Sequence, residues 1–120
     1  MVQKVDHNEV EKAKTFVLAK IMDYVPNSIV IRTILSKTTG NIKAFSFDSG
    51  EIMIERVIPF DTFVHIIEGQ AEVVIEGISN LLDTGESIII PAHAPNVLKA
   101  NERFKMISTV IKSGYEGSIL

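Results

Sequence analysis

Arg56 lies in a row of apolar residues, which is an unusual place for a permanent cation. In the stretch Glu51–Ile58, one set of alternating positions carries Ile52, Ile54, Arg56 and Ile58. Successive side chains of a strand point to opposite faces, so we expect this set to face the interior, with Arg56 near the strand end. A guanidinium offers five donors suited to a carboxylate or a phosphate. The alternative is that the aliphatic part of Arg56 is buried and its guanidinium reaches solvent.

Two histidines are further candidates for chemistry. His93 lies in the loop Ala92–Pro95, where it could transfer protons or bind a metal, and the alternative is an exposed loop residue. His65 lies within an apolar stretch, and we expect it to be a packed residue under a helix or at a subunit interface. The chain has no cysteine, which excludes thiolate metal sites and disulfides.

Short strands must position these residues. From Ser28 onward the apolar pattern has a period of two, and glycines and prolines separate the runs, which is typical of an antiparallel sandwich or barrel. The predicted strands are Ile29–Leu35, Ile42–Phe47, Glu51–Val57, Thr62–Ile67, Ala71–Glu76, Ile78–Leu82, Ser87–Ile90, Asn96–Ala100 and Phe104–Lys112.

The segment before these strands has a helical pattern. Asn8 can cap a helix, and apolar residues follow at helical spacing at Val10, Ala13, Val17 and Ile21. We therefore expect residues 1–27 to form a helical extension that packs on the strands and covers a sheet edge. Residues 28–113 would form the strand domain, and 114–120 a C-terminal tail.

Composition limits the classes of function. A chain of 120 residues with 46% hydrophobic residues suits one packed domain. The net charge is −3 and no basic cluster is present, so we expect no nucleic-acid partner. No apolar run reaches membrane-spanning length and the N-terminus lacks a signal-like apolar core, so we expect a cytoplasmic protein with no membrane partner.

The order of the turns resembles that of a known family. Along the chain the turns read Asp48-Ser49-Gly50, Pro59-Phe60-Asp61, Glu68-Gly69, Glu76-Gly77, Asp83-Thr84-Gly85-Glu86 and Pro91-Ala92-His93-Ala94-Pro95-Asn96. This order resembles the small single-domain cupins of the type-2 conserved barrel family. The resemblance implies an all-β fold, an antiparallel cupin barrel of the double-stranded β-helix or jelly-roll kind, preceded here by the short helical segment.

The resemblance also implies where a metal would be bound, and the residues there are substituted. The family's two paired histidines fall on Arg56 and Ile58, its glutamate on Thr62 and its closing histidine on Asn96. Arginine is cationic and isoleucine has no donor atom, so neither can coordinate a metal. We therefore expect no metal and no cofactor. The predicted ligand pocket consists of Arg56, Thr62 and Asn96, with His93 at the barrel mouth.

The stretch Thr62–Ile67 is apolar on both of its faces. A strand buried on both sides needs a second cover, and small cupins commonly dimerise through such surfaces. We therefore expect a homodimer.

Three functions remain open at this point, because one barrel fold hosts many activities. The first is a metal-free cupin that binds a small polar or anionic molecule inside the barrel. The second is a metal-dependent enzyme of the dioxygenase or isomerase kind, which would use substitute ligands such as His93. The third is a non-catalytic dimeric interaction protein with a vestigial pocket.

Overall fold

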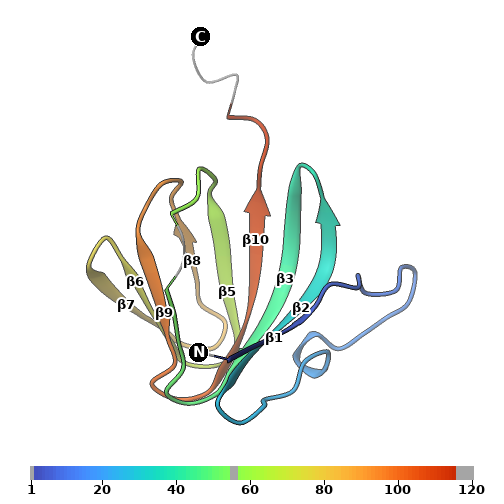
Figure 1. The fold of residues 1–120 in the computed structure, drawn as a ribbon, viewed down its shortest axis with the longest axis horizontal. Coiled ribbons are helices and arrows are strands. Elements are labelled where there is room, and N and C mark those ends of the chain that lie inside the picture. The colour runs from blue at the N-terminus through green and yellow to red at the C-terminus, as the bar shows by residue number, and fades with distance from the viewer. Residues whose placement is uncertain (1, 55–56, 116–120) are drawn as a thin grey trace.

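The chain folds into two β-sheets that face each other, as the computed structural model shows for residues 2–54 and 57–115. The larger sheet has the strand order β1-β2-β3-β10-β5-β8, and the smaller has β4-β9-β6-β7 (Figure 1). The strands are β1 Val2–Asp6, β2 Ser28–Lys37, β3 Gly40–Phe47, β4 Ile52–Ile54, β5 Thr62–Gly69, β6 Ala71–Ile75, β7 Ile78–Leu82, β8 Ser87–Ile90, β9 Asn96–Lys99 and β10 Phe104–Ile111.

All nine predicted strands are confirmed, with ends that differ by a few residues. All of their pairings are antiparallel, whereas β1 pairs with β2 in parallel. The period-two pattern predicts these strands well because each one buries one face against the opposite sheet.

Aromatic side chains fill one end of the barrel. Phe47 and Phe104 are opposite each other on β3 and β10, and their rings stack with centroids 4.4 Å apart. Both side chains are fully buried, as are Ile29 and Ile66. The other end, where β10 ends and β3 begins, is less tightly filled and contains a cavity.

The face assigned to β4 by its sequence is wrong. Met53 is buried, whereas Ile52 and Ile54 are exposed. The reason is the neighbouring strand: Met53 is paired with Leu98 of β9, whose side chain is buried in the core. Because cross-strand partners share a face, Met53 faces inward. The prediction that Arg56 faces inward assumed that Ile52 and Ile54 face inward too. Arg56 itself lies outside the described residues.

The predicted N-terminal helix is also wrong. In its place the structure has strand β1 and a single turn of 3-10 helix, η1, at Leu18–Lys20. Ala13 has a left-handed backbone with φ 63°, which an α-helix cannot contain, and Val10 donates its N–H to Ile34 of β2. Long-range bonding thus replaces the helical ladder. No helix among the described residues has the length and apolarity needed to cross a membrane.

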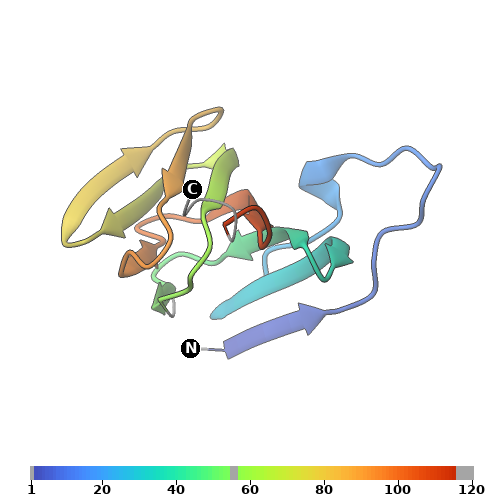
Figure 2. The same ribbon diagram turned by 90° about the horizontal axis from the view of Figure 1, so that it is seen from above.

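The segment around η1 folds back from the edge of the larger sheet and is held there by polar contacts (Figure 2). Lys105 of β10 is buried, and its ammonium donates to the carbonyl of Ala19 at 2.6 Å. The same ammonium lies 3.8 Å from the carboxylate of Glu68, which accepts a hydrogen bond from the Tyr24 hydroxyl at 2.5 Å. These contacts attach the N-terminal segment to β5 and β10.

Candidate functional site

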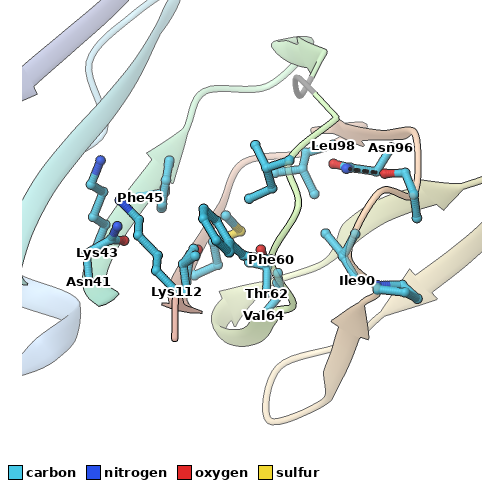
Figure 3. Close-up of a pocket in the computed structure, with 16 residues that line it drawn as sticks. Asn41, Lys43, Phe45, Phe60, Thr62, Val64, Ile90, Asn96, Leu98 and Lys112 are labelled. Carbon is cyan, nitrogen blue, oxygen red and sulfur yellow. Dashed lines mark hydrogen bonds between the residues drawn. The ribbon is translucent and has the colours of Figure 1, made fainter. Parts of the chain in front are cut away.

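A cavity of about 320 Å³ lies between the two sheets (Figure 3). This volume is within the range of small-molecule sites and equals roughly ten water volumes. Its walls come from both sheets and from the loop before β5. Polar and aromatic residues among those that line it are Lys43, Phe60, Thr62, Asn96, Ser108 and Lys112.

The inner wall of the cavity is apolar. Val64, Leu98 and Met106 line it, and each is only 1% exposed. Phe60, from the loop before β5, adds an aromatic face, and its ring lies 5.9 Å from that of Tyr115. A water molecule against this wall would find few partners, so the surface favours an apolar ligand body.

Lys43 places a cation on the inner face of the larger sheet. On β3 it shares its face with the buried Phe45 and Phe47, and its cross-strand partners are Thr33 and Ser108, both buried. The side chain of Lys43 is half-buried and lines the cavity. Its place in the register, rather than chance, therefore directs it toward the interior.

Lys112 provides a second cation at the open end. It follows β10 and continues the row of Met106, Ser108 and Val110, and it lines the cavity while exposed to solvent. Figure 3 shows Lys112 and Lys43 on the same side of the cavity. Within residues 2–54 and 57–115 neither lysine forms an ion pair, so two positive charges are left for an anion.

Asn96 lies on the opposite side of the cavity, at the start of β9 (Figure 3). Its side chain is 8% exposed, and its Nδ2 donates to the carbonyl of Ala94 at 3.1 Å. Its Oδ1 is buried and has no hydrogen-bond partner among the described residues. Leaving such an acceptor unpaired costs about 1–3 kcal/mol, so the position calls for a functional explanation.

The sequence-predicted site residues are only partly brought together. Thr62 and Asn96 both line the cavity. His93 does not: it is exposed, its backbone is left-handed with φ 67°, and its N–H donates to Ile58. Arg56 is outside the described residues.

His65 lies on the outer face of β5, away from the cavity. Its Nδ1 is 2.6 Å from the hydroxyl oxygen of Ser87, and its ring stacks on Phe63 with centroids 6.3 Å apart. His65 therefore packs against Phe63 and Ser87 on the outer face, where a ligand in the cavity cannot reach it.

Comparison with known proteins identifies the family. No family model matches the chain, and no curated protein does. A conserved protein of unknown function from Streptococcus pyogenes is similar in crystal structure, with 30% identity, TM-score 0.83, and coverage of 88% of this chain and 93% of that one. A cupin superfamily protein from Desulfitobacterium hafniense has 22% identity and TM-score 0.81, over 88% and 97% of the two chains. A cupin 2 conserved barrel domain protein from Leptotrichia buccalis has 28% identity and TM-score 0.78, over 81% of this chain and 47% of that one.

The chain is a small cupin. Cupins often hold a divalent metal, which requires suitable ligands in the cavity. Of the four family positions, Ile58, Thr62 and Asn96 line this cupin's cavity. Ile58 has no donor atom, and Thr62 and Asn96 offer only neutral oxygens. Among the described residues, no group of three or more histidine, cysteine, aspartate or glutamate residues could hold a metal. The donor set, with two lysines beside it, does not fit a divalent cation.

The two lysines are the site residues that sequence reasoning missed in this cupin. The signal was present: Lys43 alternates with Phe45 and Phe47 in a predicted strand, and Lys112 alternates with Phe104, Met106 and Ser108. Since bulky apolar residues mark the inner face, both lysines belong to inner rows. Strand parity in Glu51–Ile58 and the family's metal positions both indicate Arg56 instead.

Proposed function

We propose that this cupin binds a small polar or anionic molecule in its barrel cavity and does so without a metal. The observation that carries the proposal is the pair of cavity lysines, which have no anionic partner among the described residues. The side chain of Lys43 is half-buried, and an anionic ligand in the cavity would compensate its positive charge. Thr62 and Ser108 add neutral hydrogen-bonding groups beside it.

The test combines metal analysis with ligand screening. Purified protein is assayed for bound metals by mass spectrometry, and its melting temperature is measured with a panel of small organic acids, alcohols and sugars. We expect substoichiometric metal and a raised melting temperature with acids. Filling the cavity with Ser108→Phe should abolish the shifts. Stoichiometric metal, or shifts that survive in this variant, would contradict the proposal, and the first result would favour a metal-dependent enzyme.

We also propose that the protein is a homodimer. On the outer face of the larger sheet, Phe63 and Ile89 are cross-strand partners and are 43% and 61% exposed. The next strand, β10, adds Ile107 opposite His65. We call Phe63, Ile89 and Ile107 the outer patch. Such a contiguous apolar surface favours an isologous contact between two copies.

Light scattering with size-exclusion chromatography tests the dimer. The wild-type chain should have twice the mass of the monomer at micromolar concentration, and Ile89→Glu should shift it to the monomer. A matched control is Leu81→Glu, which changes an exposed residue of the smaller sheet. A monomeric wild-type chain, or dissociation by the control alone, would refute this interface.

A further inference from the structure

We infer that the ligand is a small carboxylic acid with an apolar body and a hydroxyl or other hydrogen-bond donor at its far end. This inference rests on the proposed binding function and names the class of molecule. It follows from three features of the cavity walls: a cationic side, an apolar inner wall and one unpaired acceptor opposite the cations.

The cationic side selects the charged group. Lys43 is set into the inner face of β3 and Lys112 stands at the open end, so an anion that enters meets Lys112 first and Lys43 deeper in. Lysines act as point charges with up to three donors each. Ser108, the cross-strand partner of Lys43, lies beside it with a hydroxyl that can donate to the same group. Two ammoniums and a hydroxyl suit a carboxylate.

The unpaired Oδ1 of Asn96 determines which chemical group the ligand has at the end far from the lysines. Asn96 Oδ1 can only accept a hydrogen bond, so the ligand group that meets it must donate one. A second anion or an ether would be repelled there, and a methyl group would leave the acceptor unsatisfied. This oxygen is closed to water, so the proposed hydrogen bond requires the cavity wall to move aside when the ligand binds.

The volume of the cavity limits the size of the body. Lys43 belongs to the larger sheet and Asn96 to the smaller one, so a ligand that bridges them carries its two polar groups at opposite ends. A cavity of about 320 Å³ suits a small molecule with a body of about one ring. Phe60, Val64 and Leu98 line the space between, and they provide apolar contacts for a flat or aliphatic body.

Three matched probes test the class by calorimetric titration of the full chain. They are 4-hydroxybenzoate, 4-methylbenzoate, which lacks the donor, and 4-hydroxybenzamide, which lacks the charge. We expect 4-hydroxybenzoate to bind roughly five- to tenfold more tightly than either analogue, because one hydrogen bond or one charge contact is lost in each. Inorganic phosphate is added as a competitor, and it should compete weakly.

Variants then assign each preference to its residue. In Lys43→Met the acid should lose most of its advantage over the amide but keep its advantage over the methyl analogue. In Asn96→Leu the acid should keep its advantage over the amide and lose most of its advantage over the methyl analogue. The control Lys99→Met removes a half-buried strand lysine that does not line the cavity, and it should change neither ratio. Circular dichroism confirms that each variant folds, and the wild-type ratios test the inference even if one does not.

The outcomes separate this inference from the proposed function. Equal affinities of the three probes, or strong competition by phosphate, overturn the ligand class. If none of the probes binds but other members of the small-molecule panel bind and are blocked by Ser108→Phe, the class is wrong and the binding function stands. If nothing in the panel binds, both fail.

Discussion

The contact between β5 and β10 forms one wall of the cavity, and a pair of glycines allows its tightness to be measured. Gly69 ends β5 opposite Phe104 and has φ +80°. A Cβ built on it would lie 2.4 Å from the carbonyl oxygen of Arg103 and 3.0 Å from the Cα of Phe104. Gly77 has the same φ of +80°, but a Cβ there would meet nothing within 4 Å. The two glycines share the same φ and differ in the space around them.

The expected costs follow from these distances. A left-handed backbone costs an alanine about 1–2 kcal/mol, and Gly→Ala returns about 0.4–1 kcal/mol by restricting the unfolded chain. Gly77→Ala should therefore lose about 1 kcal/mol. In Gly69→Ala the backbone of β10 must also move, and overpacking adds about 1–3 kcal/mol, which gives a total of roughly 2–4 kcal/mol.

Urea unfolding followed by circular dichroism measures both variants, with two-state behaviour checked by coincident transitions from a second probe. The difference between the two losses measures the steric cost at Gly69, because the cost of the left-handed backbone is the same in both variants. Losses that agree within about 0.5 kcal/mol would refute the close approach of β5 to Arg103 and Phe104.

Three further predictions follow from single residues. Lys105→Met should lower the free energy of unfolding by about 2 kcal/mol and speed proteolysis before β2, because it removes the buried ammonium bonded to Ala19. The exposed control Lys20→Met should do neither, and an unchanged digestion rate in Lys105→Met would contradict the attachment. The N–H of Asn27, donating to Asp48, lowers the pKa of that carboxyl below its ordinary value. The resulting stabilisation is fully present above the ordinary pKa and is lost as pH falls through the lowered folded-state pKa. Asp48→Asn should thus lower the urea midpoint near neutral pH but much less in strong acid, and an equal deficit at both would contradict this. His93→Gly should keep the melting temperature and every ligand-induced shift, since glycine favours φ 67°; loss of ligand binding would return His93 to the site.

Local patterning determined the strands of this cupin. Alternation in Ile42–Phe47 and Phe104–Lys112 depends only on the backbone period. The turns at Gly50 and Gly85 have positive φ, which glycine adopts without steric cost. These properties act over a few residues, so the strands and the cupin resemblance could both be predicted from the chain alone.

Tertiary structure decided which face of each strand is inside and therefore what the cavity contains. Met53 faces inward because Leu98 is its partner. The N-terminal segment is not an α-helix because Val10 is bonded to Ile34 of β2 and Ala13 has a left-handed backbone. The depth of Lys43 depends on Thr33 and Ser108 beside it. In β4 the alternation leaves either face as a candidate for the interior, so pairing with a distant strand decides which face is buried.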